Sequence, residues 1–189
     1  GSHALSANTT GTDSIAIGYQ ALSQGTALTQ QLAIGNQAGY NTTGSDNVFI
    51  GHQAGYNNTS GNFNVAIGHR VFMQNTAGSS NVAMGIGALG ASTTGSDNVA
   101  IGAIALDATT SGSRNTGVGR YALGNNTTAD ENTAVGYNSL KENTTGTNNV
   151  AVGADALDAN TTASDCTAVG TDSLTSNTTG NSNSAMGFD

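Results

Sequence analysis

The chain has 189 residues, of which 8% are charged and 36% are hydrophobic, and it contains 27 glycines but no proline or tryptophan. So few charges exclude ordinary intrinsic disorder, and so few aromatic residues argue against a globular core built from large side chains. The net charge of −8 opposes binding to nucleic acid or to an anionic membrane surface.

The two ends of the chain are interpreted separately from the rest. Gly1-Ser2-His3 is typical of the remnant of an expression tag, and we expect residues 4–189 to form a single repeat domain. Because Gly187-Phe188-Asp189 stops a few residues into a new repeat, we expect this domain to be a fragment of a longer protein. No apolar run in it approaches the ~18 residues of a membrane span.

A hydrophobic triplet followed by glycine recurs throughout the chain. Of the ten intervals between consecutive glycines of this motif, nine are 17 residues long and one, from Gly35 to Gly51, is 16 residues long. Such a fixed period is the signature of a repeat architecture in which each unit packs on the next. The eleven glycines are Gly18, Gly35, Gly51, Gly68, Gly85, Gly102, Gly119, Gly136, Gly153, Gly170 and Gly187.

Aligned on this glycine, which we number position 0, the repeat reads N-V-A-I-G-x-x-A-L-x-x-N-T-T-G-x-x. The V-A-I triplet predicts a short strand, and the glycine after it suits a tight corner. The x-A-L segment predicts a second short strand, while N-T-T-G is typical of a turn. These elements indicate an all-β fold, a parallel β-solenoid of about eleven coils, because a helical repeat needs ~33 residues or more.

The alternation of side chains along the strand assigns its residues to two faces. We expect the apolar residue at position −1, such as Ile101, and the leucine at position 4, such as Leu106, to fill the lumen of the coil. The alanine at position −2 then faces outward, where close approach of identical chains would cover it. The expected contact alanines are Ala66, Ala83, Ala100, Ala134, Ala151 and Ala168. Structural turns are assigned to Asn98, Gly102, Gly119 and Gly136.

The repeated Asn-Val-Ala-Ile-Gly motif, followed by an alanine-containing segment, resembles the head repeat of YadA-like trimeric autotransporter adhesins and related trimeric fibres of phages and bacterial surfaces. The resemblance covers residues 12–189. It implies a left-handed parallel β-roll that assembles as an elongated homotrimer outside the cell, on a bacterial or virion surface. It also implies attachment to a glycan or protein of a host or prey cell, without direct membrane insertion of this fragment.

Residues 40–73 depart most from the regular repeat and contain five of the nine aromatic residues. Outward-facing tyrosines in adjacent coils would form an aromatic ledge for a sugar or a protein partner. The alternative is local repacking, in which larger side chains compensate for the short repeat and for Phe49 at the alanine position. The expected ligand-binding patch consists of Tyr40, Tyr56, His52, His69 and Arg70.

Two further hypotheses concern rows of identical side chains. The threonine that recurs at position 8 is the basis of the alternative function, an ice-binding face like that of solenoid antifreeze proteins. His52 and His69 should stack in consecutive coils, and in a trimer they would form rings of imidazoles for a metal or an anion. The simpler interpretation of the two histidines is a pair of exposed residues in a variable column.

No arrangement typical of catalysis is present in the sequence. No serine has a catalytic partner and no glycine-rich loop precedes a helix, so we expect neither enzymatic activity nor a cofactor. Asn-X-Thr triplets such as Asn41-Thr42-Thr43 match glycosylation acceptors, but a ladder of asparagines bonded to the backbone explains the recurring asparagine better. Cys166 replaces asparagine at position −4 and is expected to be a buried thiol.

Overall fold

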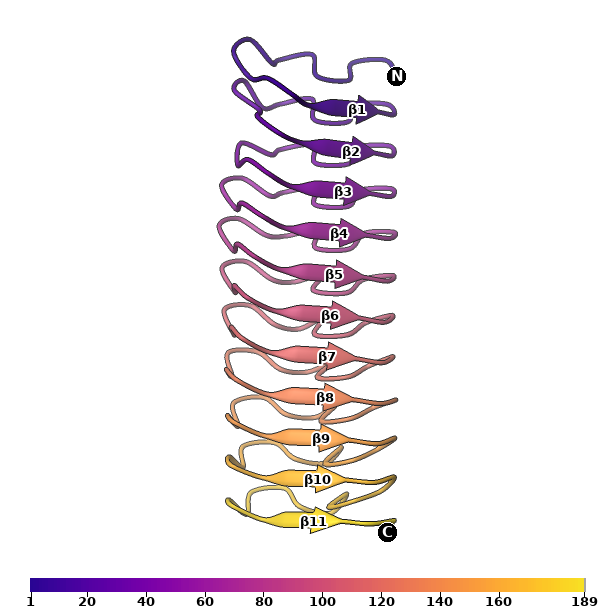
Figure 1. Ribbon diagram of the computed structural model, residues 1–189, viewed down its shortest axis with the longest axis vertical. Coiled ribbons are helices and arrows are strands. Elements are labelled where there is room, and N and C mark those ends of the chain that lie inside the picture. Colours follow the sequence, from indigo (N-terminus) through magenta and orange to yellow (C-terminus); the bar gives the residue numbers. More distant parts are fainter. Residues whose placement is uncertain (189) are drawn as a thin grey trace.

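The computed structural model describes residues 1–188 as a rod of stacked coils (Figure 1). Each coil contributes one three-residue strand, and the strands pair in chain order as one parallel sheet along the rod. The predicted all-β parallel solenoid is therefore confirmed. The strands are β1 (Ile15–Ile17), β2 (Leu32–Ile34), β3 (Val48–Ile50), β4 (Val65–Ile67), β5 (Val82–Met84), β6 (Val99–Ile101), β7 (Thr116–Val118), β8 (Thr133–Val135), β9 (Val150–Val152), β10 (Thr167–Val169) and β11 (Ser184–Met186).

The second predicted strand, over the x-A-L segment, is not formed in residues 1–188, and this prediction is wrong. Positions 2 and 4 both have left-handed backbone, as in Ile104 with φ 62° and Leu106 with φ 52°. Left-handed residues on either side of position 3 cannot follow the extended path of a strand. The segment turns sharply instead, and the side chains of Ala105 and Leu106 are both fully buried.

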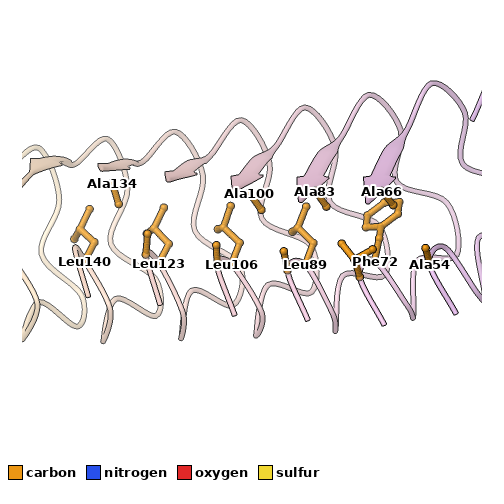
Figure 2. Packing of buried hydrophobic residues seen from close by; sticks show 14 of the residues in the cluster. Ala54, Ala66, Phe72, Ala83, Leu89, Ala100, Leu106, Leu123, Ala134 and Leu140 are labelled. Carbon is orange, nitrogen blue, oxygen red and sulfur yellow. The ribbon is translucent and has the colours of Figure 1, made fainter. Parts of the chain in front are cut away.

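The lumen is lined by the middle residue of each strand, which is alanine except at Phe49 and Gly117, and, from the opposite wall, by positions 3 and 4 (Figure 2). The burial of Leu106 confirms the prediction for the leucine column. The orientation predicted for the strand is wrong, because Ile101 is 38% exposed on the outer face whereas Ala100 is 0% exposed. Only a small side chain fits opposite a leucine in so narrow a coil.

The alanines expected at a contact between chains therefore cannot form one. Each is fully buried within a single chain, so that a second chain has no access to its side chain. This correction applies to Ala66, Ala83, Ala100, Ala134, Ala151 and Ala168.

Glycine at position 0 is required both by the backbone and by the next coil. Gly102 has φ 137°, a conformation that residues with a side chain rarely adopt. A Cβ atom on Gly102 would also lie 2.5 Å from the carbonyl oxygen of Gly119. The same two constraints act at Gly136, where the carbonyl oxygen of Gly153 would be 2.3 Å away. This corner therefore admits no other residue type, which explains why glycine never varies at position 0.

A ladder of buried asparagines at position −4 runs through the interior, as the sequence predicts. Nδ2 of Asn98 donates to Oδ1 of Asn81 at 3.2 Å and to the carbonyl oxygen of Gly112 at 2.9 Å. The backbone NH of Asn98 donates to the same Oδ1 at 3.0 Å. This pattern begins at Asn64 and continues to Asn149. Each coil is thereby tied to the one before it by paired hydrogen bonds to one buried oxygen.

Cys166 replaces asparagine in this ladder and is buried, as predicted. Its backbone NH donates to Oδ1 of Asn149 at 2.9 Å, and its Sγ lies 3.2 Å from the carbonyl oxygen of Gly180. Because the thiol lacks an amide oxygen for the following coil, Asn183 donates instead to Asn177 and Gly180. The first ladder therefore ends at Cys166.

A second ladder, at position 7, is interrupted. Nδ2 of Asn75 donates to Oδ1 of Asn58, and Nδ2 of Asn143 donates in the same way to Asn126. Where serine or threonine takes this position, the side chain is too short to bond to the neighbouring coil. The buried hydroxyl oxygens without a hydrogen-bond partner in this column are those of Thr42, Ser92 and Thr109.

Phe49 is the one large residue in the alanine column, and the opposite wall makes room for it. The leucine of position 4 is replaced by Gly39, ten residues before Phe49, and by Gly55, six residues after it. A Cβ atom on Gly55 would lie 2.4 Å from the Phe49 ring, and one on Gly39 would lie 2.9 Å from it. Local repacking around Phe49 is therefore found, although smaller neighbours rather than larger ones provide it.

We expect Phe49→Ala to leave a cavity and to lower the free energy of unfolding by about 3–5 kcal/mol. Adding Gly55→Leu should restore most of that loss, because the φ of Gly55, 61°, is close to the 52° of Leu106. Gly55→Leu alone should destabilise, since its side chain overlaps the Phe49 ring. Chemical denaturation of the two single variants and the double variant measures this coupling. Equal losses in Phe49→Ala and the double variant would contradict the compensation.

Ser92→Asn should join the interrupted second ladder and raise the free energy of unfolding by about 0.5–1.5 kcal/mol. The new amide would reach Oδ1 of Asn75 and the carbonyl oxygen of Gly95, as the other asparagines of this column do in their own coils. Ser92→Ala is the matched control, because it removes the unpaired hydroxyl without adding a ladder bond. Thermal unfolding compares the two, and an asparagine variant no more stable than the alanine variant would refute this assignment.

Candidate functional site

The outer surface of the sheet is an aliphatic surface that extends along the rod and that we call the sheet face. None of the strands β1–β11 contains a charged residue. Ile101 is 38% exposed, and Val135 and Val152 are each 37% exposed. Soluble chains rarely leave so long an apolar surface open to water. Its aliphatic members are Ile15, Ile17, Leu32, Ile34, Val48, Ile50, Val65, Ile67, Val82, Met84, Val99, Ile101, Val118, Val135, Val150, Val152, Val169 and Met186.

Charged residues lie beside the sheet face rather than on it. The position that precedes the ladder asparagine is acidic in several coils and basic at Arg114. Nε of Arg114 lies 2.9 Å from Oε1 of Glu131, and both side chains are about half exposed, so this ion pair adds little stability. The acidic members of the column are Asp13, Asp46, Asp97, Glu131 and Asp165.

The aromatic residues of the predicted patch form two stacked pairs. The rings of Tyr40 and Tyr56 lie with centroids 5.0 Å apart and planes at 8°. The rings of His52 and His69 lie 5.1 Å apart at 11°, which confirms that the two histidines stack. Because the rings stack along the rod, their edges point outward. The tyrosines therefore present ring edges rather than the flat ledge that the sequence suggested.

Neither a metal-ligand cluster nor a membrane span is found in the part of the chain that the structure describes. Residues 1–188 contain no group of three or more histidine, cysteine, aspartate or glutamate side chains placed to hold a metal ion. The same residues contain no helix with the length and hydropathy needed to cross a membrane.

From Thr43 to Thr161, the threonines at position 8 form a row in which each hydroxyl donates to the backbone of the next coil. The hydroxyl of Thr93 donates to the carbonyl oxygen of Thr110 at 3.0 Å, and Thr110 donates to Thr127 at 3.1 Å. The segment that carries these threonines has no strand in residues 1–188. Hydroxyls bonded to the backbone of a turn do not favour an ice-binding face, which presents threonine from a flat strand.

A notch of about 480 Å³ opens in the wall opposite the sheet, which we call the back wall. The notch exists because the coil that begins at Gly85 lacks two side chains. Its positions 2 and 5 are Gly87 and Gly90, whereas every other coil carries a side chain at one or both positions. A Cβ atom on Gly87 would meet nothing closer than Oδ1 of Asp107 at 4.0 Å, so the space above this glycine is open.

Two charged groups line the notch, and neither forms an ion pair within residues 1–188. Burial raises the pKa of the Asp107 carboxyl, and a hydrogen bond from the backbone of Gly90 only partly offsets this effect. Nε of Arg70, on the other side, contacts Sδ of Met73 at 3.3 Å. The notch therefore combines a guanidinium and a half-buried carboxylate.

The remaining surface of the notch is largely apolar. Ile86 and Ile104 both line it, and Ile86 is 63% exposed. Of the predicted patch, His69 and Arg70 belong to this notch, whereas Tyr40, Tyr56 and His52 lie outside it. Sequence reasoning missed Ile86, Ile104 and Asp107. The available signal was that this one repeat has glycine at both position 2 and position 5, where each of the others has a side chain at one or both.

Comparison with known proteins adds no site that could be transferred to this chain. No protein-family model, no curated protein and no solved structure matches it. The functional assignment therefore depends on the sheet face and on the back wall.

Asp107→Asn should make the chain more stable at pH 7. Because burial raises the folded-state pKa of Asp107 above the unfolded value, the ionised carboxylate opposes folding at neutral pH. This cost is lost as the pH falls through the folded-state pKa, and the advantage of the asparagine variant should shrink with it. Denaturation of both chains from pH 7 to below 3.8, the ordinary pKa of aspartate, measures the difference. A difference that is constant or grows in acid would contradict this assignment.

Proposed function

We propose that this chain is a segment of an extracellular homotrimeric fibre that attaches a bacterium or a virion to the surface of a host or prey cell. The observation that carries the proposal is the sheet face. Its row at position −1 is aliphatic from β1 to β11, and its row at position −3 is aliphatic or carries a short hydroxyl side chain without a charge; a single chain leaves both rows partly exposed. Another copy of the same rod offers a surface of equal length, equal spacing and equal chemistry to cover them.

Three chains are proposed because of the resemblance to YadA-like head repeats, which also supports a left-handed coil. Three sheet faces directed toward a common axis would cover one another and leave no aliphatic row in water. The side chains that meet are then the valines and isoleucines of positions −3 and −1, in place of the alanines that the sequence suggested. The charged column beside the sheet face would form the polar rim of the contact.

The gain from assembly comes from many small contributions. Complete burial of a valine or isoleucine side chain contributes about 1.5–3 kcal/mol relative to full exposure. In a single chain Ile101 and Val152 have already lost more than half of their exposure to neighbouring coils, being 38% and 37% exposed. Each therefore gains only part of that amount in the trimer, and stability increases with the number of coils that are paired.

The same arrangement directs the back wall outward. Leu106 points into the lumen from this wall and Ala100 points into it from the sheet, so the two walls lie on opposite sides of the coil (Figure 2). A trimer that buries the sheets leaves the notch and the stacked tyrosines on the outer surface of the fibre. Attachment is therefore proposed through the back wall, where the sequence varies most between coils.

Sedimentation of the intact chain tests the proposal. We expect a species of three times the 18.6 kDa chain mass. Ile67→Asp combined with Ile101→Asp should dissociate it, because uncompensated carboxylates would be buried between the chains. The matched control is Ala108→Asp, at the back-wall position where another coil carries Glu142. This control should remain trimeric.

A monomeric wild-type chain would overturn the proposal, as would a trimer that survives both carboxylates on the sheet face. Circular dichroism of the double variant establishes that the coil itself remains folded. A monomer with thermal hysteresis activity would favour the ice-binding alternative instead.

A further inference from the structure

We propose that the notch binds a carboxylate-bearing sugar residue, such as a uronic or sialic acid. In this assignment Arg70 binds the carboxylate, Asp107 accepts hydrogen bonds from ring hydroxyls, and Ile86 contacts the nonpolar side of the ring. The inference rests on the proposed function, because it names the chemical class of the cell-surface ligand that the fibre would bind.

The guanidinium of Arg70 is the group that selects an acidic ligand. Its Nε is directed to Sδ of Met73 at 3.3 Å, which places the side chain against the wall of the notch. Sulfur is a weak acceptor, and no carboxylate of residues 1–188 lies within 4.0 Å of this guanidinium. Arginine offers a planar pair of donors that matches the two oxygens of a carboxylate.

The carboxylate of Asp107 supplies the complementary acceptor. A Cβ atom on Gly90 would lie 2.4 Å from Oδ1 of Asp107, so the carboxylate lies directly over this glycine. It belongs to the coil two repeats beyond Arg70, and coils are about 4.8 Å apart. The two charged groups are therefore carried by backbone segments that are about 10 Å apart along the rod axis, with the coil of Ile86 between them.

This separation favours a sugar over a simple zwitterion. In an α-amino acid the ammonium and carboxylate groups are attached to one carbon, so they cannot reach both walls together. A pyranose carries its carboxylate at one end and hydroxyl groups at the other. It also has a face of C–H groups that suits the exposed Ile86 side chain, which is 63% exposed. The notch volume of about 480 Å³ is sufficient for one such residue.

Attachment by a trimer would use three such notches. Each one alone is shallow and bounded by exposed side chains, so we expect weak binding of a single sugar. Three copies on one fibre, and more on a cell with many fibres, raise the overall avidity without any new contact.

The test uses the intact chain and the methyl glycosides of glucuronic acid and N-acetylneuraminic acid, with methyl glucoside as the neutral match. Ligand-observed NMR titration should show binding of at least one acidic glycoside and at least about tenfold weaker binding of methyl glucoside. The comparison of the two acidic glycosides distinguishes the two sources of the carboxylate. Arg70→Gln should remove the preference for the acidic ligand.

Gly87→Gln is the decisive variant, because it fills the notch and leaves Arg70 and Asp107 in place. The backbone tolerates it, since Gln53 occupies the same position in another coil with φ 54° and Gly87 has φ 67°. Binding should fall by at least about tenfold, with the thermal unfolding midpoint unchanged. Asn138→Gln, at the same position of a coil without a notch, should leave binding unchanged.

Three results would overturn the inference: no binding by the wild-type chain, equal binding of the neutral glycoside, or full binding by Gly87→Gln. Sedimentation of the same samples separates this inference from the proposed function. A trimer that binds none of the three glycosides refutes the notch alone, whereas a monomer refutes the trimeric fibre whatever the titration shows.

Discussion

The hydrogen bonds between successive ladder asparagines are the constraint on which the rest of the rod depends. Oδ1 of Asn81 accepts both the backbone NH and the side-chain Nδ2 of Asn98, and the same Asn98 amide also holds the carbonyl oxygen of Gly112. These bonds are buried, so a slip of one residue would leave several polar groups without partners. The ladder therefore fixes both the register of the sheet and the length of the turn that closes each coil.

The shape of the lumen and the chemistry of the surface follow from that register. In-register coils place the same repeat position of successive coils above one another. A change in side-chain size at one position must therefore be matched by the residues that it contacts. Phe49 is accommodated by Gly39 and Gly55, and the short repeat is accompanied by Gln31, whose Nε2 bonds to Gly44. Changes inside the coil are therefore few and matched by their neighbours, whereas the back wall varies freely between coils. A rod with one uncharged, largely aliphatic side and one variable side is suited to self-assembly on the first and recognition on the second.

Much of this architecture could be predicted from the period alone. A 17-residue repeat with a glycine corner indicates a solenoid, and the column positions place Leu106 in the lumen and stack His52 on His69. Which face of the strand lines the lumen could not be predicted, because Val99, Ala100 and Ile101 are all apolar. The alternation of side chains alone does not say which of the two faces is buried. What decides it is the width of the coil, which leaves room only for alanine opposite leucine. The left-handed backbone of Leu106 could not be predicted either, since leucine rarely adopts this conformation.

The functional surface was predicted less completely for a related reason. Aromatic and histidine side chains drew attention to residues 40–73, but the notch is produced by side chains that are missing at Gly87 and Gly90. Asp107 lines the notch because these side chains are missing, although nothing distinguishes it from other aspartates in the sequence. A recurring residue is easier to recognise in a sequence than a side chain that is missing from one repeat position.

The most direct measurement of the central constraint is an NMR experiment that detects scalar coupling through hydrogen bonds. In-register stacking predicts a coupling from the backbone nitrogen of Asn98 to the side-chain Cγ of Asn81, and equivalent couplings along the ladder from Asn64 to Asn149. Each partner should lie one repeat earlier in the chain. Couplings to residues at another separation, or their absence throughout a folded sample, would contradict the asparagine ladder and the parallel stack built on it.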